Sequence, residues 1–222
     1  MAALERSGEG VGRIAIMSQF FQIHPDDPQR RLIYRSVEII RDGGVIIYPT
    51  DSLYALGCHI GDKAAMERIR RIRRAGKKHQ FTLVCRDLSE IAQYARVENW
   101  AYRLLRSHTP GPYTFILRAT SEVPKRLQDA RRKTIGIRVP HHPIAQALLT
   151  ELGEPIMSST LLLPDDELPV TDMQDIRAHL EHLVDAIIDG GYCGIQPSTV
   201  VDLVGGSPEV LRVGKGDVSA FA

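Results

Sequence analysis

The stretch GGVIIYPTDSLYALG, residues 43–57, joins a short apolar run to a cluster of small polar side chains. The Val/Ile/Tyr run at residues 45–48, with glycines before it and Pro49 after it, predicts a β-strand. The following loop carries Thr50, Asp51, Ser52 and Tyr54. Ligands of α/β proteins usually bind where strands end, which makes this loop a candidate binding site. The alternative is that Asp51 and Ser52 only cap a turn.

Strands and helices are predicted to alternate along the rest of the chain. Apolar residues at helical spacing predict helices over residues 28–42, 62–72, 88–94, 100–106, 143–152 and 172–183. Short apolar runs predict strands near residues 20–23, 81–85, 113–118, 134–139, 155–160, 184–188, 198–202 and 209–212. This order, closed by a hairpin, predicts one α/β domain with a twisted mixed β-sheet flanked by helices. We expect the domain to span residues 17–222, with residues 1–16 as a loose N-terminal extension.

The composition is that of a soluble globular protein, with 43% hydrophobic and 25% charged residues among 222. No run of about 18 apolar residues predicts a membrane span. Three cysteines without a C-x-x-C pair predict neither a disulfide framework nor a zinc site, so the cytosol is the expected compartment. His179 and His182 lack a third ligand at metal spacing and are expected on the surface, with no metal site.

Charge is divided unevenly along the chain. Residues 1–150 hold 25 Lys and Arg against 14 Asp and Glu, whereas residues 151–222 hold 3 against 13. The basic half indicates a surface for an anionic partner, or else the two halves pair within one fold. Seven basic residues lie between Arg68 and Lys78 with no acid among them. This run favours contact with phosphates over a merely solvated helix face.

Further candidate binding groups follow other predicted strands. Ser158, Ser159 and Thr160 end one strand as three successive hydroxyls, and Ser198 begins another. Arg138 is a single charge among apolar neighbours, so either it points at a ligand or it extends to solvent. The chain has no GxxxxGK[ST], HExxH or GxSxG motif and no strand-linked GxGxxG. A bound nucleotide would therefore be held by neither a P-loop nor a Rossmann turn.

Ordered blocks along the chain resemble the YrdC/YciO superfamily, and most closely its YciO branch. The blocks are GGVIIYPTDSLYALG (43–57), PGPYTFIL (110–117), TIGIRVPHHP (134–143), PIMSST (155–160), STVVDL (198–203) and LRVGKG (211–216). The resemblance implies a YrdC-like fold of the YrdC/RibB type, with a basic concave surface that binds double-stranded RNA or tRNA. It also implies a nucleotide pocket that takes ATP or AMP, with Mg²⁺ expected to accompany a triphosphate.

The family's chemistry is the synthesis of L-threonylcarbamoyladenylate from threonine, bicarbonate and ATP, for threonylcarbamoyladenosine (t6A) in tRNA. By resemblance, Thr50 matches a threonine contact, Arg138 and Ser198 match phosphate-holding groups, and Arg212 matches an arginine at the pocket rim. Arg73 stands where synthases carry the Lys of a K-x-R element, and Ala75 replaces its Arg. The synthase S-x-N element is Thr160-Leu161-Leu162 in this chain, which removes the amide.

These departures lead to two hypotheses. In the first, the protein binds nucleotide and RNA in t6A chemistry but is a poor or altered synthase, acting on a finished nucleotide or tRNA adduct. In the second, it is a working synthase in which Arg73 and nearby lysines replace the missing cations. A purely structural role would leave three hydroxyl clusters at strand ends unexplained. The sequence leaves open the true substrate, whether RNA is substrate or ligand, and the oligomeric state.

Overall fold

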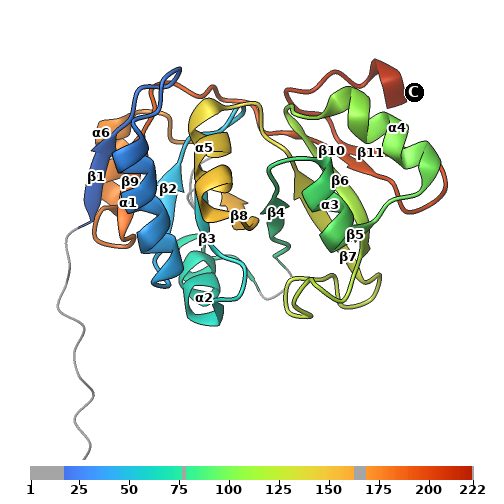
Figure 1. The fold of residues 1–222 in the computed structure, drawn as a ribbon, viewed down its shortest axis with the longest axis horizontal. Helices are drawn as coiled ribbons and strands as arrows, with labels where there is room; N and C mark the ends of the chain where they lie inside the picture. Colours follow the sequence, from blue (N-terminus) through green and yellow to red (C-terminus); the bar gives the residue numbers. More distant parts are fainter. Residues whose placement is uncertain (1–17, 77–78, 163–168, 222) are drawn as a thin grey trace, which may run out of the picture.

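The chain forms a mixed, twisted β-sheet with helices on both of its faces (Figure 1). A computed structural model describes residues 18–76, 79–162 and 169–221. The helices are α1 (Arg30–Arg41), α2 (Lys63–Ile72), α3 (Leu88–Tyr94), α4 (Asn99–His108), α5 (Pro143–Leu152), α6 (Met173–Leu180) and the 3₁₀ turn Ser219–Phe221. The strands are β1 (Gln19–Gln22), β2 (Ile46–Tyr48), β3 (Ala55–His59), β4 (Thr82–Val84), β5 (Ala95–Arg96), β6 (Tyr113–Ala119), β7 (Thr134–Arg138), β8 (Ile156–Thr160), β9 (Ala186–Asp189), β10 (Thr199–Asp202) and β11 (Glu209–Arg212).

All the described strands belong to one sheet, in the order β1-β9-β2-β3-β8-β4-β7-β6-β10-β11, with β5 paired to β6. Parallel pairs (β1·β9, β9·β2, β4·β7 and β6·β10) are mixed with antiparallel ones. The predicted α/β class and mixed sheet are confirmed. Within the described residues, no helix is long and apolar enough to cross a membrane.

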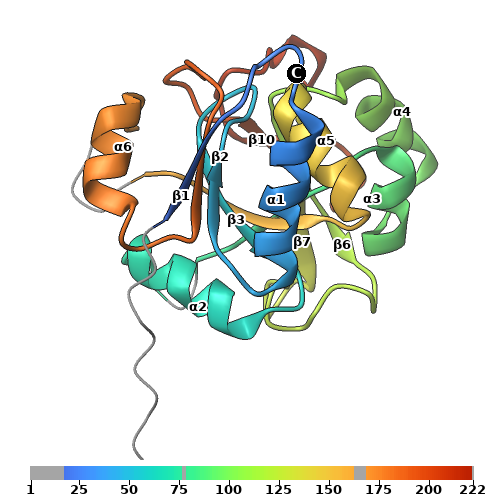
Figure 2. The same cartoon turned by 60° about the vertical axis from the view of Figure 1, so that its left-hand side comes forward.

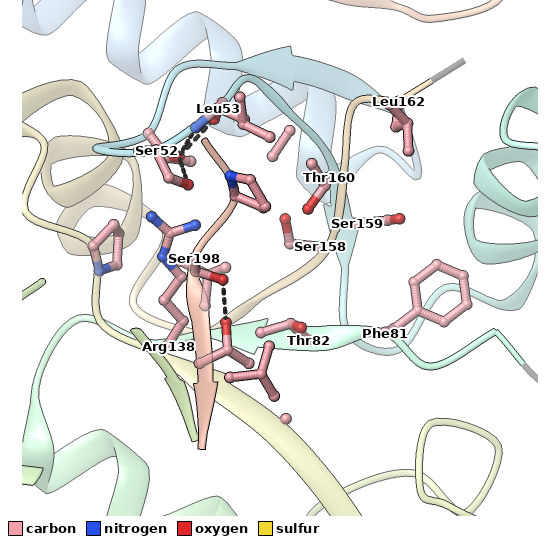
Figure 3. A pocket seen from close by; sticks show the side chains of 18 of the residues that line it. Ser52, Leu53, Phe81, Thr82, Arg138, Ser158, Ser159, Thr160, Leu162 and Ser198 are labelled. Carbon is pink, nitrogen blue, oxygen red and sulfur yellow. Dashed lines mark hydrogen bonds between the residues drawn. The ribbon is translucent and has the colours of Figure 1, made fainter. Parts of the chain in front are cut away.

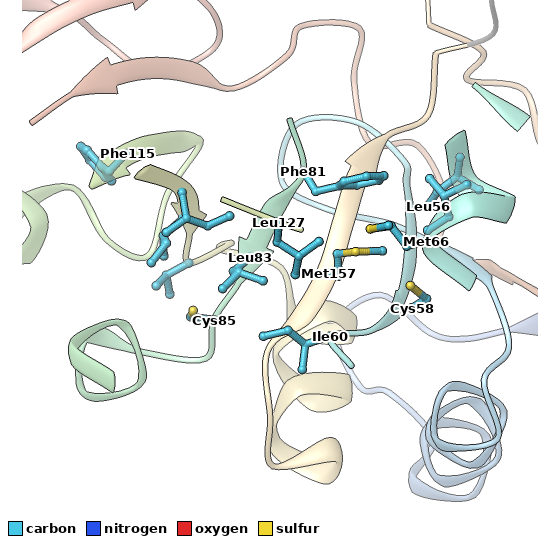
Figure 4. Packing of buried hydrophobic residues seen from close by; sticks show 14 of the residues in the cluster. Leu56, Cys58, Ile60, Met66, Phe81, Leu83, Cys85, Phe115, Leu127 and Met157 are labelled. Atoms are coloured by element: carbon cyan, nitrogen blue, oxygen red, sulfur yellow. The ribbon is translucent and has the colours of Figure 1, made fainter. Parts of the chain in front are cut away.

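The two faces of the sheet bury separate hydrophobic clusters because successive strand residues point to opposite sides. Helices α1 and α5 pack beside each other on one face, as Figure 2 shows, and cover alternate residues such as Ile46 and Tyr48. Helices α2, α3, α4 and α6 contribute to the cluster on the other face, which includes Ile47. Figure 4 shows part of this second cluster, with Met66 of α2 and Met157 of β8 packed together.

Local sequence signals fix most helix ends. Asp62, Asp87 and Asp172 each accept a backbone N–H from the first turn of the helix that follows, as expected of N-cap residues. Gly153 ends α5 at φ 74°, the left-handed conformation that glycine adopts most readily. Pro28 was expected inside the start of the first helix, but it precedes the cap residue Gln29 because α1 begins at Arg30.

The stretch at residues 43–57 is a hairpin, and its second strand was not predicted. β2 pairs antiparallel with β3, although no strand was predicted after the loop that carries Thr50 to Tyr54. The sequence ALGCH lacks the alternation of a half-buried strand because β3 is covered on both faces. Gly57 is required there: a Cβ would lie 2.8 Å from both the Tyr48 ring and Ile156 Cγ2. Tyr48 therefore packs across β3 only because that position lacks a side chain.

Two predictions fall partly or wholly on residues that the structure does not describe. The expected extension at residues 1–16 lies outside the described residues, so it stays a prediction. The basic run from Arg68 to Lys78 ends in two residues, 77 and 78, that lie outside the described part of the chain. The other predicted helices and strands are present, with ends that differ by a few residues.

Candidate functional site

A cavity of about 600 Å³ opens over one face of the sheet, between β3, β4, β6, β7, β8 and β10 (Figure 3). Cross-strand register brings its floor together, because Thr82 is paired with both Gly136 and Ser158, and Thr114 with Val200. Paired residues project to the same side of a sheet, so alternate positions of five strands share this surface. The floor is formed by Thr82, Val84, Thr114, Ile116, Gly136, Arg138, Ser158, Thr160 and Val200.

The six residues proposed from the sequence line this one cavity, although they are distributed over 162 positions of the chain. They are Thr50, Arg73, Arg138, Thr160, Ser198 and Arg212. The sheet assembles them. Arg138, Thr160 and Arg212 are the last residues of strands, Ser198 directly precedes β10, Thr50 follows β2, and Arg73 directly follows α2. Their shared location is what the sequence interpretation requires, whereas their individual roles stay predictions.

Thr50 organises the loop between β2 and β3. Its hydroxyl donates to the Leu53 carbonyl at 2.5 Å and accepts the backbone N–H groups of Ser52 and Leu53 at 3.2 Å each. A hydroxyl has one proton and two lone pairs, so these contacts occupy all of them. Ser52 Oγ lies 3.3 Å from Thr50 Oγ1 and keeps capacity for a further partner. A ligand that contacts the Thr50 hydroxyl must therefore compete with the loop's own hydrogen bonds.

Arg138 is the buried cation of the cavity, 8% exposed at the end of β7. Its Nη2 donates to Asp51 Oδ1 in an ion pair whose two side chains are each 10% exposed. The second oxygen of Asp51 accepts the His141 backbone N–H at 3.0 Å. Arg138 Nε is buried and has no hydrogen-bond partner in the described part of the chain. The side chain lines the cavity and is buried, which decides against the solvent alternative.

Asp51 belongs to the loop that the sequence marks as a candidate binding site, but its role as the partner of Arg138 was not predicted. The structure shows that it pairs with an arginine 87 positions away. Its backbone carbonyl also accepts Lys215 Nζ at 2.5 Å, so the C-terminal segment is tied to the same loop. The one available signal was the arginine itself, since a buried guanidinium in an apolar strand requires an anionic partner.

Ser198, directly before β10, and Arg212, at the end of β11, form a second polar group across the cavity. Arg212 donates from Nη2 to the Ser198 carbonyl at 2.8 Å and to Ser198 Oγ at 3.3 Å. The same hydroxyl lies 2.8 Å from Thr114 Oγ1. Partial burial lowers the pKa of Arg212, and the positive charge of Arg138 lowers it further. The two guanidinium groups therefore repel each other across a space that a bound anion would stabilise.

Arg73 and Thr160 mark another wall, where the end of α2 meets the end of β8. Arg73 Nη1 donates to the Thr160 carbonyl, and its buried Nε has no described partner. Desolvation lowers the pKa of Arg73. His79 lies beside it, with Nε2 2.9 Å from Ser159 Oγ. Burial lowers the pKa of His79, as do the charges of Arg73 and Arg70.

Taken together, the described lining residues include three arginines and no aspartate or glutamate. Hydroxyl groups from the loop and strands face the same space, as Ser52, Ser158, Thr160 and Ser198 in Figure 3 show, whereas Ser159 points away towards His79. Cations and hydroxyls that converge without a carboxylate form a site for an anion. Leu162 also lines the cavity, so the position of the missing amide is apolar.

A resident metal does not fit this set of donors. Mg²⁺ prefers oxygen ligands that include carboxylates, and the described lining offers none. No group of three or more His, Cys, Asp or Glu among the described residues is arranged to hold a metal ion. Any Mg²⁺ would therefore have to enter with the phosphates of a nucleotide.

Two arginines of the basic run on α2 are ion-paired within the fold, and phosphate contact by the rest of the run stays a prediction. Arg68 Nη1 pairs with Asp185 Oδ2 at 2.5 Å, and Arg70 Nη1 pairs with Glu67 Oε1 at 2.8 Å. The acidic partner of Arg68 comes from the acidic half of the chain. Part of the opposite charge on the two halves is therefore neutralised by ion pairs within the fold. Sequence spacing could not show this pairing because Asp185 is 117 positions away.

The fold and site define a Sua5/YciO/YrdC-type α/β protein, and comparison with known proteins bears this out. The family model for these proteins, described as "Telomere recombination", matches residues 38–214. The chain belongs to this family. E. coli (strain K12) YciO is 60% identical over 205 residues, which cover 92% of this chain and 100% of that protein.

Solved and curated relatives extend the comparison. The E. coli YciO crystal structure matches with a TM-score of 0.90 and 59% identity, over 93% of this chain and 100% of that one. The threonylcarbamoyl-AMP synthase of Hydrogenovibrio crunogenus is 31% identical, over 76% of this chain and 91% of that protein. P. abyssi Sua5 complexed with L-threonine shares the fold, with a TM-score of 0.81 and 24% identity over 89% of this chain and 58% of that one.

Proposed function

We propose that this protein binds a nucleotide in the cavity and double-stranded RNA or tRNA on the surrounding surface, in t6A chemistry, as an altered relative of the synthases. The observation that carries the proposal is the convergence of Arg73, Arg138 and Arg212 on one cavity whose described lining has no carboxylate. Such a cavity favours a ligand with several negative charges, as a nucleotide has.

The phosphates would be held by Arg138 with Ser198 and Arg212. Arg138 lines the cavity, and its orientation is fixed by Asp51 before any ligand arrives. A preorganised donor stabilises negative charge without reorganising during the reaction. Thr50 keeps the loop closed against the cavity, which places Ser52 Oγ beside the same space.

The altered synthase elements support the view that adenylate synthesis is weakened. Leu162 stands where the amide of the S-x-N element would be, and Ala75 where the arginine of K-x-R would be. Each lost contact to developing charge costs on the order of 3 kcal/mol, about two decades in rate. A substrate that already carries the threonylcarbamoyl group, free or on tRNA, would not need those contacts.

One observation favours active synthase as a second candidate function. Arg73 lines the cavity and is fixed to the end of β8 through the Thr160 carbonyl, so a cation remains near the altered element. The P. abyssi relative binds L-threonine and the H. crunogenus relative is a threonylcarbamoyl-AMP synthase. In this alternative the cavity would take ATP with its Mg²⁺, together with threonine.

Two measurements test these proposals. Titration calorimetry with AMP and with ATP should show binding that Arg138→Met weakens by at least tenfold, whereas Arg35→Ala, on the outer face of α1, leaves it unchanged. Equal affinity in wild type and Arg138→Met would reject the pocket. Incubation with ATP, threonine and bicarbonate should give little adenylate and diphosphate, and turnover equal to that of the H. crunogenus enzyme would favour the synthase.

A further inference from the structure

Two arginines face each other on the short β5–β6 pair without any acidic partner. Arg96 of β5 is directly opposite Arg118 of β6, and both side chains are exposed. Like charges directly opposite in an antiparallel pair destabilise it. Neither guanidinium has an ion pair or hydrogen bond to any residue that the structure describes.

This pair lies on the same face of the sheet as the cavity. Along β6, Thr114 and Ile116 line the cavity, and Arg118 is the next residue on that side. Two strand residues advance about 7 Å, so Arg118 continues the cavity floor towards the end of β6. Arg96 projects to the same side because it is the direct cross-strand partner.

One acidic group on this face of the sheet, Asp202, is already neutralised. Asp202 of β10 is paired in register with Ile116, which places it on the same face. Its carboxylate is 4% exposed and accepts Arg132 Nη2 at 2.6 Å. It therefore leaves the positive charge of Arg96 and Arg118 uncompensated.

We propose that Arg96 and Arg118 bind a backbone phosphate of an RNA strand whose own nucleotide enters the cavity. This inference rests on the proposed function and narrows it from a free mononucleotide to a nucleotide within a polynucleotide. The guanidinium fork matches the geometry of phosphate oxygens, and one phosphate between two arginines removes their repulsion. A mononucleotide in the cavity does not extend to the pair, so the pair affects RNA binding alone.

The test measures binding of a tRNA transcript against salt concentration for wild type and two matched double variants. Arg96→Ala/Arg118→Ala removes the proposed contacts. Arg103→Ala/Arg106→Ala removes two exposed charges from α4, whose buried residues Ala101 and Leu105 pack on the opposite face of the sheet. Because these substitutions are at exposed positions, both variants should melt near the wild-type temperature.

We expect the first variant to lose at least tenfold in tRNA affinity and, because one phosphate contact is lost, to reduce the slope of log K against log salt by about 0.7 to 0.9. AMP affinity should stay unchanged, and the α4 variant should bind tRNA like wild type. An unaltered slope in the first variant, or an equal loss in the α4 variant, overturns the inference. The inference is also overturned if poly-glutamate competes with the tRNA for binding as well as unlabelled RNA does. If AMP binds but tRNA does not, this inference fails while the nucleotide pocket stands; if neither binds, the proposed function fails as well.

Discussion

The pair of Asp51 and Arg138 allows a sharp prediction about the stability of the cavity. Both side chains are 10% exposed, so replacing Arg138 with Met leaves a carboxylate without its counter-ion in a mostly buried place. Breaking a buried ion pair by removing one partner costs about 3–5 kcal/mol. The His141 N–H still donates to the second oxygen of Asp51, which favours the lower end, about 3 kcal/mol. For a chain of this length, that loss lowers Tm by roughly 6–12 °C.

A double-mutant cycle separates the ion pair from simple loss of packing. Asp51→Asn keeps the shape of the side chain but removes its charge, so the Asp51→Asn/Arg138→Met variant has no buried charge without a partner. We expect urea denaturation to give this double variant at least 2 kcal/mol more stability than the sum of the two single effects predicts. Additive effects in the cycle would refute the reasoning, because they would mean that neither charge depends on the other.

Nucleotide binding should respond differently from stability in the same four proteins. If Arg138 contacts the ligand, both variants that lack it bind AMP at least tenfold more weakly, even where the double variant has regained stability. Asp51→Asn alone keeps the guanidinium in the cavity and should retain much of the affinity. Recovery of AMP binding in the double variant would show that Arg138 acts only through folding.

Three other outcomes follow from the packing and charges. Gly57→Ala should destabilise the protein by at least about 2 kcal/mol in urea melts, because the added methyl lies 2.8 Å from the Tyr48 ring, and a change below 0.5 kcal/mol would contradict the packing. Arg132→Ala should cost about 3 kcal/mol in urea melts, because it leaves the buried Asp202 carboxylate without its counter-ion, and a loss below 0.5 kcal/mol would argue against the ion pair. The pKa of His79 is lowered in the fold, so the stability that neutral His79 contributes is present above the unfolded pKa of about 6.5 and is lost as pH falls. Between pH 7.5 and pH 5.5, urea melts should therefore show a smaller loss of stability for His79→Gln than for wild type. Equal losses of stability in the two proteins would count against this role of His79.

Local sequence alone determined the order of the elements and the chemistry that they carry. Helix ends follow from Asp62, Asp172 and Gly153 because capping depends on residues a few positions apart. The hydroxyl groups at strand ends and the lone Arg138 were also evident, since each is recognised against its immediate neighbours. These signals suffice to propose a site because they are short-range.

Only the tertiary structure decided which charges are free and which residues meet. Arg68 looked like a phosphate ligand until the fold brought Asp185 to it, and Asp51 looked like a turn residue until the fold brought Arg138 to it. Strand register placed six distant residues around one cavity and left Arg96 opposite Arg118. Ion pairing and strand pairing act between segments far apart in the chain, so their outcome depends on the assembled sheet.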